Sequence, residues 1–320
     1  MPDEERSLRA GDGCWAVQSS GAERSLQAAI VFRSNGSSEA AIDEARRAGE
    51  IARDAGDERS LALAENLIGE IEWERGRWEL ASRLFGAARE HAEGAAEPAL
   101  LLLVESNDAA LCTDLGQDAL ARDSLATALA RIELVDDHPA ASRILRNLAR
   151  ALAADGQTTA ADGLLARAEV VAKRGSDFVE GATLAIERTR LALAQRDALW
   201  AEAHMSTVAA LVERAGSDVL CADAACLEGE IHRFRGRREA AERNLRLAIE
   251  QAGASKAARV CARAWRVLAE LLLEQARVDE ALEALNAARL QFVAMGARAW
   301  ADDVARRTAE VRAVADSGSA

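Results

Sequence analysis

One stretch of the chain places apolar and polar residues with the period of an α-helix. Apolar residues line one face of Leu61–Arg75 and one face of Glu79–His91, and Gly76 separates the two runs. Glycine readily adopts the left-handed backbone that ends a helix, so this pattern predicts a helical hairpin. Gly69 and Ala81 place a residue without bulk on each run, which lets the two helices approach closely.

The same pattern recurs along the chain with a fixed offset of forty residues. The turn position is occupied by Gly36, Gly76, Gly116, Gly156, Arg196, Gly236 and Ala276. The first small position of the second helix is always alanine, at Ala41, Ala81, Ala121, Ala161, Ala201, Ala241 and Ala281. A larger residue, in most units, and then a small one follow four and seven positions later, as at Phe85 and Ala88. This register without insertions predicts a repeat array.

The array predicts one elongated all-α domain, because repeats stack and need not close a second core. Alanine and leucine dominate the apolar residues, and tyrosine is absent, which favours helix. We expect an α-solenoid of about seven antiparallel helix-turn-helix units, closed by a polar capping helix at 297–315. The expected divisions are a flexible lead-in at 1–21, units at 22–60, 61–100, 101–140, 141–180, 181–220, 221–260 and 261–296, and a tail at 316–320.

Charge and cysteine content limit the expected partners and the expected cellular compartment of the protein. The formal net charge of −13 at pH 7 disfavours binding to nucleic acid or to an anionic membrane surface. The amino terminus has no apolar run typical of a signal peptide, and no apolar stretch is long enough to span a bilayer. An odd number of cysteines, five, favours buried free thiols in a reducing compartment. We therefore expect a cytoplasmic protein.

The repeat resembles the tetratricopeptide repeat (TPR) over about 22–296. The residues that carry the resemblance are a small residue seven positions before the turn, at Gly69, Ala109, Ala149, Gly229 and Ala269, and the Ala–large–Ala spacing after it. The unit is longer here, at forty residues, and mostly lacks the proline that closes a typical repeat. In length it is similar to repeat regions of bacterial regulators such as the maltose activator. The resemblance implies a right-handed superhelix whose first helices line a concave groove.

In this family the groove binds peptides or partner helices, and the resemblance implies groove positions on this chain. They are Asn66, Glu70, Trp73, Asn107, Arg146, Asn147, Arg150, Arg190, Arg233, Arg263 and Arg266, with Ser106, Ala110 and Thr113 beside them. Asn107 and Asn147 occupy a slot where asparagine in this family often bonds peptide backbone. The arginines would line the groove of an acidic molecule, and their planar fork suits an acidic partner or a C-terminal carboxylate. The alternative is a solvated face on which acids pair the arginines, as at Arg266 and Glu270.

The sequence carries no motif of a nucleotide-binding loop, a nucleophile elbow or a zinc protease. The four histidines lie in different units, and Cys221 and Cys226 are five apart, so neither set has metal-ligand spacing. We expect no enzymatic activity, no cofactor and no bound metal.

Together these patterns predict a non-enzymatic scaffold that binds a peptide or partner helix in its groove. The alternative is a ligand- or peptide-responsive sensor module of a bacterial signalling or transcription-control system, acting through another chain. The sequence leaves open the partner, the biological process and self-association.

Overall fold

A computed structural model describes residues 20–34, 36–131, 140–173 and 178–318. Within these residues the chain is built from α-helices, and no strand is present. The lead-in with Cys14 and Trp15 falls mostly outside the described part of the chain. The helices are α1 (Gly21–Ser34), α2 (Ser38–Ala55), α3 (Glu58–Glu74), α4 (Trp78–Gly94), α5 (Pro98–Leu115), α6 (Asp118–Leu129), α7 (Ala141–Ala154), α8 (Thr158–Ala172), α9 (Phe178–Ala194), α10 (Ala198–Ala215), α11 (Asp218–Phe234), α12 (Arg238–Ala254), α13 (Ala258–Glu274), α14 (Val278–Met295) and α15 (Arg298–Gly318).

Consecutive helices pair as seven hairpins, from α1–α2 to α13–α14, and α15 packs on the last of them. The predicted all-α solenoid of helix-turn-helix units with a closing helix is therefore confirmed. Each predicted turn residue lies inside a hairpin and has a positive φ, including the two non-glycine residues, Arg196 at 62° and Ala276 at 58°. The unit boundaries given above remain a prediction.

Small side chains hold the two helices of a hairpin together, as the sequence pattern predicts. Ala81 and Ala88 are fully buried on α4, and a Cβ added to Gly69 on α3 would lie 2.7 Å from the Phe85 ring. The same relation recurs in the sixth hairpin, where a Cβ at Gly229 would lie 2.7 Å from Leu245. Close approach between helices therefore depends on these positions staying small.

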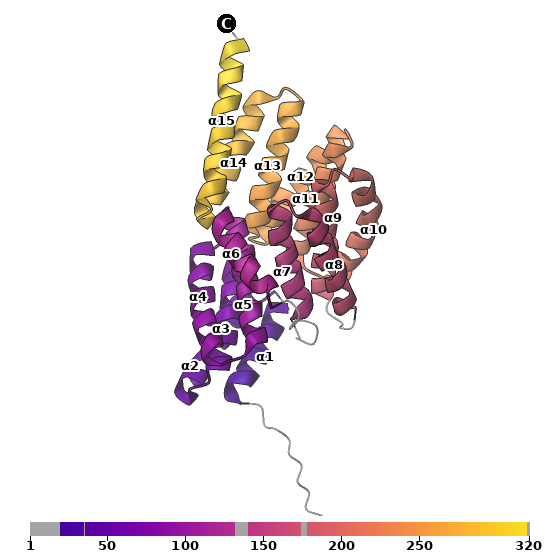
Figure 1. Cartoon of the computed structure of the whole chain (residues 1–320). Coiled ribbons are helices and arrows are strands. Elements are labelled where there is room, and N and C mark those ends of the chain that lie inside the picture. The colour runs from indigo at the N-terminus through magenta and orange to yellow at the C-terminus, as the bar shows by residue number, and fades with distance from the viewer. Residues whose placement is uncertain (1–19, 35, 132–139, 174–177, 319–320) are drawn as a thin grey trace, which may run out of the picture.

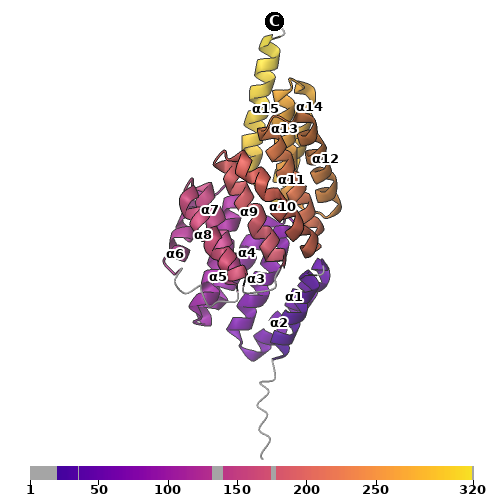
Figure 2. The same cartoon turned by 90° about the vertical axis from the view of Figure 1, so that its right-hand side faces the viewer.

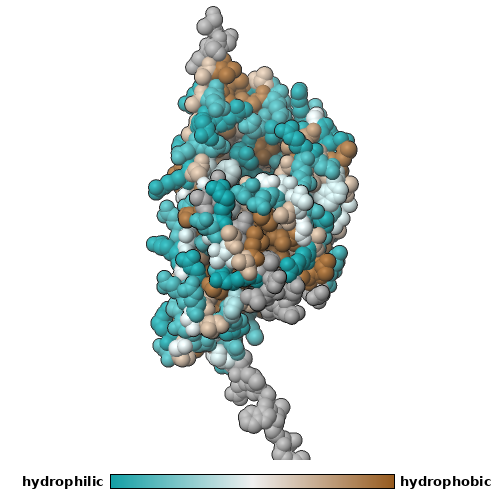
Figure 3. Space-filling model, viewed as in Figure 1, coloured by the Kyte–Doolittle hydropathy of each residue, from teal (hydrophilic) through white to brown (hydrophobic). Residues whose placement is uncertain are grey.

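The surface is largely hydrophilic, with hydrophobic residues gathered near the middle of the face shown in Figure 3. Exposed apolar residues there and elsewhere include Val170 on α8 and Leu199 and Trp200 on α10. The alanine columns face inward, so the second helices present their polar sides outward.

The stack of hairpins winds far enough that its last helices contact the second and third hairpins. The first hairpins and α13–α15 lie at opposite ends of the long axis, yet the lower end of α15 reaches the region of α5 (Figures 1 and 2). A Cβ at Gly76 would lie 2.9 Å from Ala258, and a Cβ at Gly116 would lie 2.7 Å from Ala299. Turns of the second and third hairpins thus pack against the seventh hairpin and α15. We call these two contacts the closing contacts.

Candidate ligand-binding cavity

A cavity of about 270 Å³ lies between the first helices of five hairpins, where the ends of the solenoid meet. Helices α5, α7, α9, α11 and α13 supply its walls, and α4, α14 and α15 each supply an aromatic side chain. These aromatic side chains are Trp78, Phe292 and Trp300. The volume lies near the lower limit of ordinary ligand sites, about 300 Å³. The cavity therefore suits a small group or a short part of a chain.

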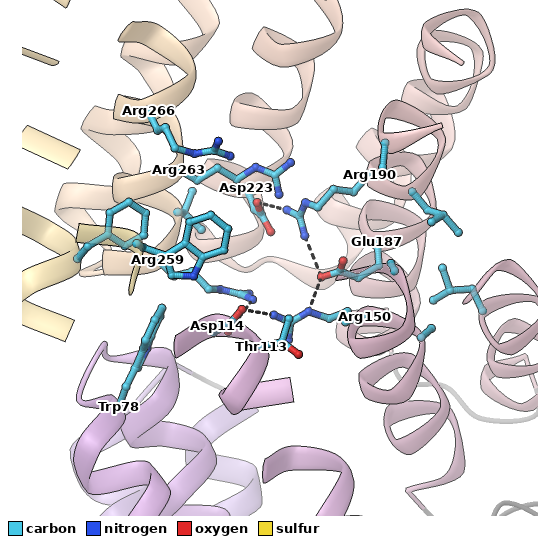
Figure 4. A pocket seen from close by; sticks show the side chains of 18 residues that line it. Trp78, Thr113, Asp114, Arg150, Glu187, Arg190, Asp223, Arg259, Arg263 and Arg266 are labelled. Carbon is cyan, nitrogen blue, oxygen red and sulfur yellow. Dashed lines mark hydrogen bonds and ion pairs between the residues drawn. The ribbon is translucent and has the colours of Figure 1, made fainter. Parts of the chain in front are cut away.

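Charged side chains from α5, α7, α9 and α11 form a network along one wall (Figure 4). Arg150 donates to Asp114 at 2.6 Å, and its Nε lies 3.5 Å from Glu187. Arg190 bridges Glu187, at 2.8 Å, and Asp223. Negative and positive side chains thus alternate along this wall, from Asp114 on α5 to Asp223 on α11.

The network keeps two of its carboxylates, Glu187 and Asp223, ionised. Burial acts to raise the pKa of Glu187, but the charges of Arg190 and Arg150 outweigh it and lower this pKa to about 2. Burial likewise opposes ionisation of Asp223, yet Arg190 and Arg259 hold the pKa of Asp223 below its usual range. Neither carboxyl group is therefore protonated near neutral pH.

The opposite wall of the cavity carries three arginines of α13, at one helical face. Arg259 lies 3.4 Å from Asp114, and Arg263 lies 2.7 Å from Glu230 on α11. Arg266 lies over the ring of Trp300, 5.9 Å from its centroid. The aromatic rings of Phe292 and Trp300 stack at 6.1 Å and complete this wall. One wall of the cavity thus carries the charged network, and the other combines arginines with aromatic rings.

A second polar cluster lies outside the cavity, between α3, α5 and α7, and we call it the asparagine ladder. Asn147 donates to Asn107 at 2.6 Å, and Asn107 donates to Asn66 at 2.8 Å. Glu70 accepts from Asn66 and Asn107, and its other oxygen pairs with Arg33 and with Arg143. All three asparagines are buried. Their side-chain amides therefore bond one another across the repeats.

The structure separates the predicted groove residues into three groups. Arg150, Arg190, Arg263 and Arg266 line the cavity, as does Thr113, whereas Ser106 and Ala110 are buried outside it. Asn66, Glu70, Asn107 and Asn147 make up the asparagine ladder. The remaining three are Trp73, which donates to Asp114 at 2.9 Å beside the cavity, Arg146, which pairs with Glu180, and Arg233, which pairs with Glu274.

Sequence reasoning missed several residues of the cavity. Glu187 and Asp223 lie on predicted first helices, and Glu187 follows Asn147 by one repeat, so the repeat register could have indicated it. Asp114 and Arg259 lie at helix ends, outside the predicted groove face. Trp78, Phe292 and Trp300 enter the cavity only because the solenoid meets itself, which no local pattern indicates.

Other chemistry has little support in the described part of the chain. No group of three His, Cys, Asp or Glu residues there could hold a metal ion. Burial raises the pKa of Cys112 and of Cys226 to about 12, so both thiols stay protonated. None of the described helices is both long and apolar enough to span a membrane.

Comparison with known proteins identifies the fold. No protein-family model matches the chain, and no match was found among curated proteins. The Rap conjugation gene regulator of plasmid pLS20, in complex with the Phr* peptide, is similar with a TM-score of 0.67 at 13% identity, over 85% of this chain and 73% of that one. Aspartyl phosphate phosphatase F from Bacillus subtilis is similar with a TM-score of 0.60 at 14% identity, over 84% and 70%.

A third similar structure is described as containing tetratricopeptide repeats. It is a signal-transduction ATPase with a tetratricopeptide repeat sensor from Pyrococcus horikoshii, with a TM-score of 0.53 at 14% identity, over 82% of this chain and 42% of that one. At such identities the likeness concerns the fold. The chain therefore has the fold of the tetratricopeptide-like helical repeat proteins.

Proposed function

We propose that this protein is a non-enzymatic scaffold that binds a short peptide, or the end of a partner chain, in the cavity. The observation that carries the proposal is the cavity itself, which brings five arginines and three aromatic rings together. Such a combination offers both orientation and buried apolar contact to a peptide. A regulator of similar fold is in complex with a peptide, which supports the same class of ligand.

The charge of the cavity favours a ligand that carries a carboxylate. Five arginines line it against three carboxylates, on a chain whose net charge is −13. An acidic side chain or a C-terminal carboxylate would pair with these guanidinium groups in two-point fashion. The same net charge disfavours nucleic acid as the partner. The described cysteines are free thiols, which supports action in the reducing cytoplasm.

Enzymatic activity has weaker support, although one protein of similar fold is named a phosphatase. Arginines hold Glu187 and Asp223 ionised, so these two groups lack the near-neutral pKa of an efficient general acid. The buried thiols are protonated and hence poor nucleophiles.

Peptide selection tests the proposal. Wild-type protein is incubated with a pool of short random-sequence peptides, and retained peptides are identified by mass spectrometry. Ala194 lines the cavity and is solvent-exposed, so Ala194→Trp places bulk in the cavity without displacing core residues. We expect Ala194→Trp to reduce retention roughly tenfold, because it occupies the space that the ligand needs.

The matched control is Ala210→Trp, which places the same side chain on the exposed face of α10 outside the cavity. This variant is expected to retain peptides like the wild type. Retention by Ala194→Trp equal to that of the control, or no retention by the wild type, would refute binding in the cavity.

A sensor role is the second candidate, and the closing contacts favour it. The cavity receives Trp78 and Asp114 from one end of the solenoid and Arg259 and Trp300 from the other. A ligand that contacts both ends changes the free energy of the closing contacts and so the curvature of the solenoid. Small-angle scattering with a selected peptide tests this role. Unchanged dimensions at saturating peptide would leave only the scaffold.

A further inference from the structure

Arg266 differs from the other four arginines of the cavity in having no carboxylate partner. Arg150, Arg190, Arg259 and Arg263 each lie within 4.0 Å of at least one carboxylate. Among the described residues, Arg266 makes neither an ion pair nor a hydrogen bond, and its guanidinium lies over the Trp300 ring. One guanidinium of the cavity is therefore left without a counter-charge at contact distance.

The surroundings of Arg266 also disfavour its positive charge. Burial and the neighbouring charge of Arg263 lower the pKa of Arg266, and the more distant Glu230, Glu270 and Asp303 offset only part of this. A charge that is costly to the free protein and has no internal partner is characteristic of functional sites.

The balance of charge indicates which ligand group would pair with Arg266. Four carboxylates pair with the other arginines, namely Asp114, Glu187 and Asp223 in the cavity and Glu230 beside it. Of the five guanidinium groups, that of Arg266 is the one with no carboxylate at contact distance among the described residues, which leaves one positive charge unpaired. A single carboxylate matches this charge better than a phosphate, which carries close to two negative charges at pH 7.

We propose that Arg266 is the residue that anchors the ligand, by pairing with one carboxylate of the bound peptide. This inference rests on the proposed function and adds the group that is recognised. Trp300 and Phe292 form the apolar wall beside Arg266, so the part of the ligand next to the carboxylate is apolar. The carboxylate comes from the C-terminus of the peptide or from an acidic side chain.

Three peptide pools distinguish these sources and test the anchor. The first pool lacks Asp and Glu and ends in a free carboxylate. The second also lacks Asp and Glu but ends in an amide, and the third has an amide end and one Glu. We expect the wild type to retain the second pool roughly tenfold to a hundredfold less than the first or the third, as the loss of a charged hydrogen bond implies.

Arg266→Gln is expected to retain the three pools equally, whereas Arg83→Gln, an exposed control on α4, keeps the wild-type preference. Equal retention of all pools by the wild type would overturn the anchor while leaving the proposed function intact. A carboxylate preference that survives in Arg266→Gln would also overturn it. No retention of any pool would remove the proposed function itself.

Stability without ligand provides an independent readout. Arg266→Gln removes an unmatched charge, so we expect its melting temperature to equal or exceed that of the wild type. Arg190→Gln leaves Glu187 and Asp223 short of a partner, so it is expected to melt several degrees lower. A loss in Arg266→Gln as large as that in Arg190→Gln would assign Arg266 a structural role and overturn the proposal.

Discussion

The pKa of Glu70 depends strongly on the charged residues around it. Its side chain is almost fully buried, and two arginines from different helices approach it. Burial acts to raise its pKa, but the charges of Arg143 and Arg33 outweigh burial and lower the pKa to about 2. The ionised carboxylate therefore stabilises the folded chain, because these arginines surround it only there.

This depression of the pKa predicts a pH dependence. The unfolded chain binds a proton at Glu70 near pH 4.5, the ordinary value, whereas the folded chain does so near pH 2. Stability is therefore full above the unfolded pKa and falls as the pH drops through this window. The unfolding free energy of the wild type should fall between about pH 5 and about pH 2. We expect this fall to be roughly 3 kcal/mol smaller in Glu70→Gln.

Denaturant titrations at several pH values measure this loss. Some of it persists in Glu70→Gln because Glu187 has a similarly lowered pKa. The control is Glu90→Gln at an exposed position of α4, which is expected to follow the wild-type curve. A Glu70→Gln curve parallel to that of the control would contradict the prediction.

The asparagine ladder shows what a repeat register can and cannot predict about single residues. The forty-residue offset places Asn107 and Asn147 at equivalent positions, and the structure confirms that they lie on neighbouring first helices. The pattern does not indicate whether such a face meets a ligand or the next helix. Here Asn147 and Asn107 each donate to the asparagine one repeat away, whereas the buried Oδ1 of Asn147 has no partner among the described residues.

At the level of helices, the hairpins follow from local spacing and were predictable. Turn residues and small positions lie four to twelve residues apart, within reach of sequence patterns. The connections between hairpins were less visible, because Ala96 and Lys256 adopt positive φ there without the glycine that usually marks such a turn. Helix packing can thus impose a conformation that the local sequence disfavours.

Two glycines of the second hairpin should respond to alanine in opposite directions. A methyl group at Gly69 would lie 2.7 Å from the Phe85 ring, so Gly69→Ala is expected to destabilise the fold by about 1–3 kcal/mol. A methyl group at Gly86 meets nothing within 4 Å, and Gly86→Ala should stabilise its helix by up to ~1 kcal/mol. Chemical denaturation of both variants measures the difference, and the same sign for both would contradict this packing.

At the scale of the whole molecule, the meeting of the two ends could not be predicted from the sequence. The closing contacts join residues far apart in the chain, such as Gly116 and Ala299. Each repeat contributes a small rotation, and the end-to-end geometry is the sum of these rotations. An error of a few degrees per repeat would separate the ends, so a correct description of every hairpin still leaves the cavity undetermined.

The closing contacts make the shape of the molecule and the cavity interdependent, which is testable. Ala258→Glu combined with Ala299→Glu places a longer charged side chain at each closing contact, against the turns at Gly76 and Gly116. We expect the solenoid to open, with its helical circular dichroism kept, because contacts within the hairpins are untouched. The radius of gyration from scattering should rise further above the ~20 Å expected for a compact chain of this length.

The control for this variant is Ala210→Glu combined with Ala305→Glu, which adds the same charges at exposed positions away from the closing contacts. It is expected to keep the wild-type dimensions and to retain peptides. The opened variant should lose peptide retention, because Arg266 and Trp300 move away from the wall formed by α5, α7 and α9. An unchanged radius of gyration would show that the stacked hairpins alone fix the curvature. Opening with full peptide retention would show that one wall of the cavity is enough for binding.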